Sequence, residues 1–323
     1  MAAYRVGVIG LGIMGNRMLD RLRQHPDLEA VAGWDPSAEA GRKSQATHPK
    51  MALEASAEAL CKRGDVDCVY IASPPASHVG HAFLALDNRK TVFIEKPLAT
   101  DFDEAQAIVE RVERDKARAA MNFSLAHAPS LIRMEEIARS GRLGKPTAAS
   151  IDVRFAAWPR PWQKGAAPWL AKRHEGGFTR EVISHFVFAL QRVLGPPDVV
   201  ESHAAYPEGD GAETALDARV IFGVTPVAIH GRVGNTSVAD LNVTAIEFER
   251  GAARLVDWTS LEIREGEPSD RWQPSDDRPE DLRQKGQVSQ LYGLVNMLAG
   301  KPHRLAKVAE GLIVQDCVEE LLD

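Results

Sequence analysis

Residues 5–15 read RVGVIGLGIMG, and this stretch decides the fold. Residues 5–9 form a short apolar run typical of a buried strand, the next six residues have the spacing GxGxxG, and residues 16–24 follow a helical pattern. In that order, the first glycine permits a tight turn, the second lets the backbone approach a pyrophosphate, and the third lets helix and strand pack closely. The stretch therefore indicates a dinucleotide site rather than an ordinary glycine-rich turn, with cofactor-binding candidates Gly10, Gly12, Ile13, Met14 and Gly15.

A second predicted strand, residues 28–34, ends at Asp35, twenty residues after Gly15. A carboxylate at about this distance accepts hydrogen bonds from the ribose hydroxyls in dinucleotide-binding folds. Asp35 favours NAD, because the 2′-phosphate of NADP would meet a like charge. Arg42 could serve that phosphate if Asp35 turned away, so NADP is the alternative cofactor. The structural alternative is a loop carboxylate that caps the next helix.

Further strands and helices alternate through the first third of the chain. Strands are predicted at 66–72, 91–94 and 119–123, with helices at 77–87 and 103–118. This alternation predicts an α/β Rossmann domain with a doubly wound parallel sheet. Ser73 and Pro74 follow the strand at 66–72 and should line the cofactor cleft. His78 is a further candidate beside the cofactor, although a cap or packing role suits a first-turn histidine better than catalysis.

The strand at 91–94 stops abruptly at Glu95-Lys96-Pro97. Pro97 cannot continue a ladder, so Lys96 should stand at the carboxyl end of the strand, where open parallel sheets bind ligands. Our hypothesis is that Lys96 handles a proton beside the cofactor, with Glu95 orienting it. The local alternative is an exposed Lys96–Glu95 ion pair of little energetic consequence.

Composition excludes several classes of protein. The chain has 323 residues, 44% of them apolar and 26% charged, which is typical of a globular protein of two domains. Acidic residues outnumber basic ones, 45 to 39, so neither nucleic acid nor an anionic membrane is the expected partner, and a small molecule is. Three cysteines without metal-ligand spacing predict neither disulfides nor a metal site. We expect a cytoplasmic protein without a signal peptide or membrane span.

Three motifs together resemble one family. They are GLGIMG at 10–15, SPPASH at 73–78 and FIEKPLA at 93–99. The family comprises the oxidoreductases grouped with glucose-fructose oxidoreductase, inositol dehydrogenase and the rhizopine-catabolism proteins. The resemblance implies that Lys96 is the catalytic or substrate-binding lysine and that the Lys96–Pro97 bond is often cis. It also implies a homodimer or homotetramer, formed through one face of an open sheet in the second domain.

After residue 123 the periodicity changes. A helix is predicted at 129–140, closed by Gly141, and β-like runs then dominate, several of them alternating with period two. This pattern predicts an α+β domain with an open, largely antiparallel sheet. The expected domains are 1–123, 124–305 and a helix at 306–323 that packs back on the first domain. Residues 265–285 are expected to be a solvated loop before a helix at 288–298. The predicted strands are 147–155, 199–206, 215–222, 227–233, 241–248 and 252–258.

The segment GGFTREVISHF at 176–186 carries two further candidates. Glu181 and His185 are four positions apart on a predicted helix and should lie one turn apart. The family usually has an aspartate and a histidine at this spacing, both directed at the substrate. Here the first is Glu181, so the role of the aspartate transfers less securely than that of His185.

Aromatic and basic residues cluster between the two predicted domains. Trp158, Trp162 and Trp169 could stack on sugar rings, or pack a loop or an oligomer contact. Asn122 lies near the end of the last strand of the first domain and His127 in the loop after it, and both could line the same cleft. The basic residues in this region could bind a substrate carboxylate or phosphate, or lie in a solvated loop; they are Arg160, Lys164 and Arg173.

These residues predict an NAD(P)-dependent dehydrogenase of a sugar, inositol or related polyol. The hydroxyl proton passes to His185 while Lys96 stabilises the alkoxide, or Lys96 itself accepts the proton. Three alternatives remain open: an NADPH-dependent reductase of a dicarbonyl or imine, a glycosidase with tightly held NAD, and a nucleotide-sensing regulator without enzymatic activity. The presence of both Lys96 and His185 argues against the regulator, which needs no proton-transfer pair.

Overall fold

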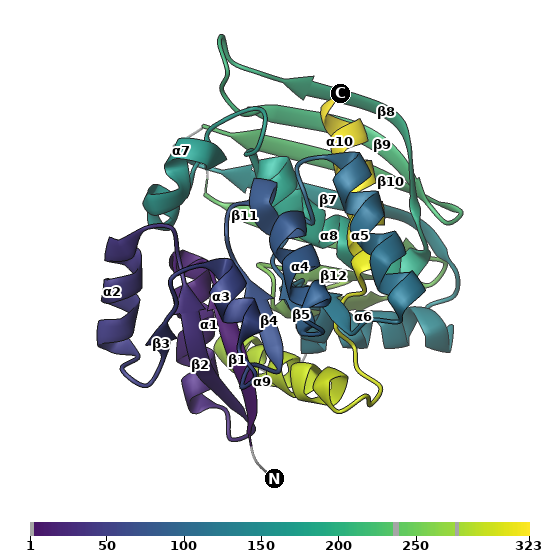
Figure 1. Cartoon of the computed structure of the whole chain (residues 1–323). Helices are drawn as coiled ribbons and strands as arrows, with labels where there is room; N and C mark the ends of the chain where they lie inside the picture. Colours follow the sequence, from purple (N-terminus) through teal and green to yellow (C-terminus); the bar gives the residue numbers. More distant parts are fainter. Residues whose placement is uncertain (1–2, 235–238, 275–277) are drawn as a thin grey trace. The chain divides into compact units, whose positions relative to one another are not determined.

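The computed structural model describes residues 3–234, 239–274 and 278–323 (Figure 1). The chain divides into two compact units, one made of residues 1–123 and 288–312 and the other of residues 124–287 and 313–323. Within the described residues, no helix combines the length and apolar character that crossing a membrane requires.

The first unit is built on a six-stranded parallel sheet with strand order β3-β2-β1-β4-β5-β6. This is the doubly wound order of dinucleotide-binding domains. Every residue of β4 and β5 is buried, as expected for strands covered on both faces. The predicted fold class is confirmed. The strands are β1 (Tyr4–Ile9), β2 (Leu28–Trp34), β3 (Ala52–Leu53), β4 (Cys68–Ile71), β5 (Thr91–Ile94) and β6 (Ala119–Met121).

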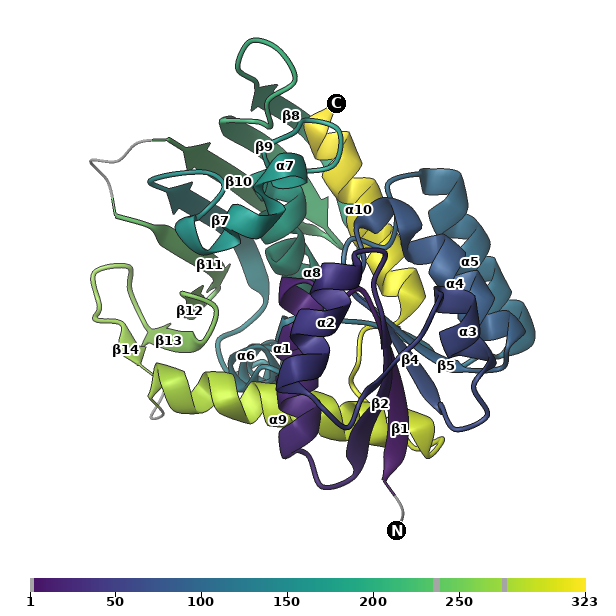
Figure 2. The ribbon, with the colours of Figure 1, turned by 60° about the vertical axis from the view of Figure 1, so that its left-hand side comes forward.

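Helices cover both faces of this sheet (Figure 2). On one face, α1 (Ile13–Gln24) and the residues of α9 (Pro279–Leu298) from Leu291 onward share a buried apolar cluster with Tyr70 and Phe93. On the other face lie α3 (Ala57–Lys62), α4 (His78–Asp87) and α5 (Phe102–Asp115). The remaining elements are α2 (Ala38–Thr47) and the short 3-10 turn η1 (Pro75–Ser77).

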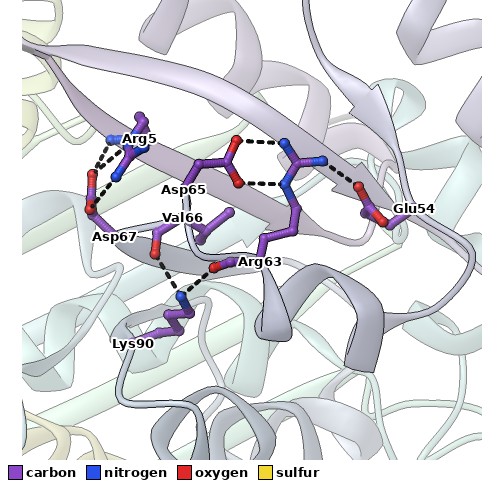
Figure 3. Close-up of polar contacts among 7 residues, drawn as sticks. All are labelled: Arg5, Glu54, Arg63, Asp65, Val66, Asp67 and Lys90. Carbon is purple, nitrogen blue, oxygen red and sulfur yellow. Dashed lines mark hydrogen bonds and ion pairs between the residues drawn. The ribbon is translucent and has the colours of Figure 1, made fainter.

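An ion-pair network is centred on the loop before β4, at the amino ends of the parallel strands, and reaches Glu54 just after β3 (Figure 3). The guanidinium of Arg63 donates to both carboxylate oxygens of Asp65, at 2.8 and 2.6 Å, and also to Glu54. Arg5 pairs with Asp67 at the start of β4, and Lys90 donates to two backbone carbonyls of the same loop. The network therefore fixes the edge of the sheet opposite the carboxyl ends, where ligands of such folds bind.

The second unit is built on an eight-stranded sheet with order β14-β13-β12-β11-β7-β10-β9-β8. Among the described strands of this sheet only β7 and β10 pair in parallel, so the expectation of a largely antiparallel sheet is confirmed. Buried and less buried residues alternate along β7, β9 and β11, which matches a sheet with one covered face. The strands are β7 (Pro146–Phe155), β8 (Pro197–Ala205), β9 (Ala215–Phe222), β10 (Thr225–Val233), β11 (Leu241–Phe248), β12 (Gly251–Val256), β13 (Ser260–Glu265) and β14 (Gln273–Pro274).

Two helices of the second unit pack on the strands and on each other. Helix α6 (Pro129–Ser140) has the predicted bounds and ends at Gly141, whose φ of +65° suits glycine. Helix α8 (Ser184–Leu194) continues from a π-helical segment, η4 (Thr179–Ile183), and buries Phe186 and Leu190 in the core. The short elements are η2 (Ser124–His127), η3 (Pro161–Ala166) and α7 (Ala167–Leu170).

The last two helices differ from the sequence-based expectation. Helix α9 begins at Pro279 rather than at residue 288, because Glu280 and Asp281 suit the positive end of a helix although their composition resembles a loop. Helix α10 (Val308–Leu322) does not form a separate segment, since its residues from 313 onward belong to the second unit. There, Tyr206 donates a hydrogen bond to the carbonyl of Leu322, which satisfies an end of the helix.

Candidate active site

The glycine motif forms the turn between β1 and α1. Gly10 has a φ of +88°, and a Cβ atom there would lie 2.5 Å from the backbone nitrogen of Ser73. A Cβ on Gly15 would lie 1.9 Å from the carbonyl oxygen of Gly10, so helix and turn touch. Gly12 is exposed, and no described atom lies within 4 Å of where its Cβ would stand. The three glycines therefore have the three geometries that a dinucleotide turn requires.

The amino end of α1 is the phosphate-facing part of this turn. Gly12 is the N-cap residue and makes no side-chain cap, and Ile13 and Met14 form the half-buried first turn. The first-turn N–H groups of a helix have no partner within the helix and attract anions. The side-chain amide of Asn16 donates to the carbonyls of Leu11 and Gly12, which holds the turn in shape. These residues fit a pyrophosphate.

Asp35 lies against the glycine turn. One carboxylate oxygen accepts a hydrogen bond from the backbone N–H of Leu11 at 2.8 Å, and the other accepts from the N–H of Ser37 at 2.8 Å. Ser37, not Asp35, caps α2, because its hydroxyl accepts from the N–H of Ala40. A carboxylate oxygen can accept more than one hydrogen bond, and Asp35 is only half-buried. Its carboxylate is therefore oriented by the loop and still has capacity for ribose hydroxyls.

The loops after β4 and β5 are joined by His78. This side chain is 1% exposed, with Nε2 lying 2.7 Å from the carbonyl oxygen of Ser73 and Nδ1 lying 2.8 Å from that of Pro97. Burial lowers the pKa of His78 to about 4, although the two carbonyl contacts act in the opposite direction. The ring links the two strand-end loops, and its expected cofactor contact stays a prediction. Ser73 and Pro74 lie in the first of these loops.

Glu95 lies in a buried polar network rather than at the surface. Its carboxylate accepts hydrogen bonds from the hydroxyl of Tyr70 and, at 2.6 Å, from the amide of Asn122. Gln290 of α9 donates to the other end of the Asn122 amide at 2.6 Å. Burial and the charge of Glu95 raise the pKa of Tyr70 well above its usual value, and Arg21 lies close enough to oppose that shift. Asn122 is 5% exposed, so here it serves Glu95, and its expected substrate contact stays a prediction.

Lys96 stands on the opposite side of the chain from this network. The backbone N–H of Glu95 still bonds to Ile71 of β4, so the strand alternation continues and directs Lys96 away from the face that Glu95 and Phe93 share. The charge of Lys96 is one of the influences that lower the pKa of His78, after burial, and the His78 ring lies against the carbonyl of Pro97. Lys96 is half-buried, and the Lys96–Pro97 bond is cis, as the resemblance implied. A rigid network therefore holds the residue that precedes the lysine.

In the second unit, Gly177 shapes the segment that carries Glu181 and His185. Gly177 has a φ of +99°, and a Cβ there would lie 2.1 Å from a carboxylate oxygen of Glu213. The other oxygen of Glu213 accepts from the backbone N–H of Thr179 at 2.7 Å, at the start of the π-helical segment. Glu213 is 1% exposed, and burial raises its pKa. A buried carboxyl group thus supports the amino end of the helix that presents Glu181 and His185.

Glu181 is held by the loop that precedes it. Its carboxylate accepts a hydrogen bond from Gln163 at 3.2 Å and lies 3.9 Å from the guanidinium of Arg160. Arg160 in turn donates to Gln163 at 2.9 Å. The longer side chain, compared with the aspartate usual in the resembled family, therefore reaches the 158–163 loop. Glu181 lies within the π-helical turn, a local geometry that often occurs at functional sites.

His185 is 8% exposed and lies at the start of α8. Its imidazole contacts the indole of Trp258 edge to face, with ring centroids 5.0 Å apart and an interplanar angle of 78°. Trp258 also packs on Phe186 at 4.9 Å. Trp258 was not predicted as a site residue, because it lies in a tight hairpin turn far from His185 in the sequence.

The three tryptophans that sequence analysis did select have different environments. The indole N–H of Trp158 donates to the carbonyl of Leu170 at 3.0 Å, so it is used within the protein. Trp162 is 48% exposed and stacks on Arg160, 4.9 Å from ring centroid to guanidinium carbon. Trp169 is half-buried in α7. Among these, Trp162 is the one whose ring presents a large surface to solvent.

The remaining candidate residues of the second unit are His127, Lys164 and Arg173. Arg173 stacks on the ring of Tyr206 at 3.8 Å, and His127 is buried in η2. The side chain of Lys164 lies outside the described part of the chain. Tyr70, Gln163, Glu213 and Gln290 were missed, since isolated polar residues in apolar or loop segments give no sequence signal.

Within the described residues no cluster of three or more His, Cys, Asp or Glu side chains could hold a metal ion.

Residues 4–123 match the model of the oxidoreductase family with an NAD-binding Rossmann fold. This matched part of the chain belongs to that family. It is the family of inositol dehydrogenase and its relatives that the motifs indicated, so that expectation is confirmed, and NAD is the cofactor of its Rossmann fold. The glycine turn, Asp35 and Lys96 all lie in the matched region.

Individual relatives show the spread of the family. A glycosyl hydrolase family 109 protein of Phocaeicola vulgatus is 39% identical over 267 residues, which cover 78% of this chain and 50% of the relative. Inositol 2-dehydrogenase 3 of Saccharopolyspora erythraea is 30% identical over 189 residues, which cover 58% of this chain and 56% of the relative. The chain spans less than two thirds of the length of the curated relatives it matches.

A solved structure extends the similarity of fold to nearly the whole chain. It is an oxidoreductase from Agrobacterium radiobacter in complex with NAD+, L-tartaric acid and magnesium. Its TM-score is 0.84 at 16% sequence identity, covering 98% of this chain and 95% of the other. At this identity the likeness concerns the fold, so both units have the architecture of an oxidoreductase structure.

Proposed function

We propose that the protein is an NAD(P)-dependent oxidoreductase that transfers hydride between nicotinamide and a hydroxyl or carbonyl carbon of a sugar, an inositol or a related polyol. One observation carries the proposal. The glycine turn follows β1 and Lys96 follows β5, and β4 pairs with both strands in parallel. Their carboxyl ends therefore lie along one edge of the same sheet, so a dinucleotide on Gly12 extends along the edge that presents Lys96.

The chain must supply the acid-base chemistry of such a reaction. When bound, NAD would supply the hydride-accepting chemistry, and the chain has to take up the hydroxyl proton as the alcohol becomes a carbonyl. In one assignment the imidazole of His185 accepts that proton, while Lys96 donates a hydrogen bond to the developing alkoxide. In the other, Lys96 itself accepts the proton. Reduction of a carbonyl uses the same groups in reverse.

Two carboxylates have supporting roles in this proposal. Glu95 keeps the backbone before Lys96 fixed, because its side chain is anchored to Tyr70 and Asn122. Glu181 accepts a hydrogen bond from a substrate hydroxyl in the place of the aspartate that the family usually has. Its contact with Gln163 orients the carboxylate for that task.

The proposal is tested with purified protein and a panel of aldoses, inositols, acyclic polyols and ketones, each with NAD(H) and NADP(H). We expect net NADH formation from at least one cyclic polyol. Reduction of a dicarbonyl or imine with NADPH alone would favour the reductase alternative. Nucleotide binding without turnover of any substrate would favour a regulator.

Asp35 decides the expected cofactor preference. Its carboxylate is held in place by Leu11 and Ser37, where a ribose 2′-phosphate would meet a negative charge. We therefore expect a higher kcat/KM with NAD than with NADP. Asp35→Asn retains the acceptor for Leu11 but removes the charge, and should narrow this difference. A wild-type preference for NADP would refute the role given to Asp35.

The similarity to a glycosyl hydrolase favours a second candidate function, NAD-dependent cleavage of a glycosidic bond. The two functions differ in what accumulates. A glycosidase releases free sugar from a chromogenic glycoside without net formation of NADH, whereas a dehydrogenase forms NADH in proportion to the oxidised product. Measuring both products in one reaction distinguishes them.

A further inference from the structure

The hairpin between β12 and β13 holds a tryptophan in a conformation that tryptophan rarely adopts. The N–H of Thr259 bonds to the carbonyl of Val256, and the two central residues of this turn, Asp257 and Trp258, have φ values of +46° and +73°. Two positive φ values in succession are characteristic of a type I′ turn, which favours Asn-Gly. A bulky side chain in this region is sterically strained.

The turn itself gives no reason for an indole at this position. Glycine or asparagine would form the same turn without the steric cost. The indole instead packs on Phe186 at 4.9 Å and against the imidazole of His185 at 5.0 Å. These ring contacts offset part of the steric cost of the backbone conformation. Strained residues of this kind cluster at functional sites.

Trp258 is also only half-buried, whereas Phe186 beneath it is fully buried. Trp258 therefore keeps some exposed surface while its ring contacts His185 at the start of α8. The indole stands nearly perpendicular to the imidazole, at 78°, so the two rings meet edge to face and are not stacked.

We propose that Trp258 is a substrate-stacking residue that selects ring-shaped polyols, such as pyranoses or cyclitols, for the site at His185. This inference rests on the function proposed above. A flat indole can contact the contiguous C–H face of a sugar ring, while an acyclic polyol must first lose rotational freedom to present a comparable face. The indole of Trp258 thus favours cyclic substrates and orients the reacting hydroxyl toward His185.

The test compares Trp258→Gly, which suits the turn, with Trp258→Phe, which keeps an aromatic face. Trp272→Ala is the matched control, because Trp272 belongs to the same unit but stacks on Arg254 and Arg264. KM and kcat are measured with a cyclic and an acyclic polyol of similar size. Polyol affinity in the presence of NADH, NADH affinity and thermal stability are measured for each variant.

We expect Trp258→Gly to raise KM for the cyclic polyol about tenfold, with a smaller change in kcat and little change for the acyclic polyol. Trp258→Phe should restore much of the loss, and Trp272→Ala should resemble wild type. NADH affinity should not change. The Tm of Trp258→Gly should stay close to that of wild type although the affinity for the cyclic polyol falls.

Two results would overturn the assignment while leaving the proposed function intact. One is an unchanged KM for the cyclic polyol in Trp258→Gly; the other is an equal loss for cyclic and acyclic polyols together with a lower Tm, which indicates a packing role. If wild-type protein neither binds nor oxidises any polyol, the proposed function fails and the assignment of Trp258 fails with it.

Discussion

At the scale of single residues, the candidate site depends on side chains that hold others in place. His78 joins two loops, Asp35 braces the glycine turn, and Glu95 anchors the chain before Lys96. The sequence indicated the residues that a known motif marks, such as Asp35 and Lys96. It could not indicate Gln290 or Trp258, because their partners lie far away along the chain and only folding brings them together.

His78 predicts a pH dependence of stability. Burial lowers its pKa to about 4 in the folded protein, compared with 6.5 for an ordinary histidine. Between these values the unfolded state binds a proton that the folded state does not, so the free energy of unfolding should decrease as pH falls from about 6.5 to about 4. The contribution reaches at most about 3 kcal/mol.

Urea unfolding of wild type and His78→Gln across this range checks the prediction. The variant lacks the titrating group but retains an amide that can donate to one carbonyl, so its stability should fall less with acidification. Parallel pH profiles for the two proteins would show that His78 does not titrate as its burial indicates.

At the scale of elements, regular strands and helices followed the sequence pattern closely, and special turns did not. Strands β2, β5, β9 and β11 have the predicted bounds, since apolar runs and alternation directly reflect burial. Helix α5 ends three residues before the expected end because Lys116 takes a left-handed conformation, with a φ of +48°. The π-helical turn before α8 has no sequence signal, although it carries Glu181.

The turn at Gly177 predicts a stability effect that depends on Glu213. Gly177→Ala should destabilise the protein by more than Gly141→Ala, a control that also has positive φ but has no described atom within 4 Å of the new Cβ. The conformational cost is about 1 kcal/mol at either site, and crowding against Glu213 should add about 1–3 kcal/mol.

Chemical unfolding of both variants measures this difference. In a Glu213→Ala background, the additional cost at Gly177 should largely disappear, because the carboxylate that the new Cβ meets is gone. Equal losses for Gly177→Ala and Gly141→Ala would contradict the close packing at Gly177.

At the scale of the whole molecule, the family and the class of each sheet, one parallel and one largely antiparallel, were predictable, because each unit has its own repeating pattern. The assignment of the last two helices to one unit or the other was not predictable, because α9 and α10 each contribute residues to both units. Composition cannot show that a helix serves two cores.

The expected homo-oligomer stays a prediction at this scale. The outward face of β8–β10 carries Ile221, which is 37% exposed, beside the Arg219–Glu201 ion pair. We expect light scattering to give a mass that is a multiple of 35.3 kDa, and Ile221→Arg to lower it. Val224→Arg is the control, because Val224 is 92% exposed in the turn between β9 and β10 rather than on the strand face. A wild-type mass of one chain would contradict the prediction.

The central claim is that Lys96 acts in the chemical step. The most direct measurement is the turnover of Lys96→Ala with the best substrate of the panel, together with its affinity for NADH. We expect turnover to fall by about 10²–10⁴-fold while NADH affinity changes little, and Lys62→Ala, a surface lysine paired with Glu58, to behave as wild type. Normal turnover by Lys96→Ala would contradict the account.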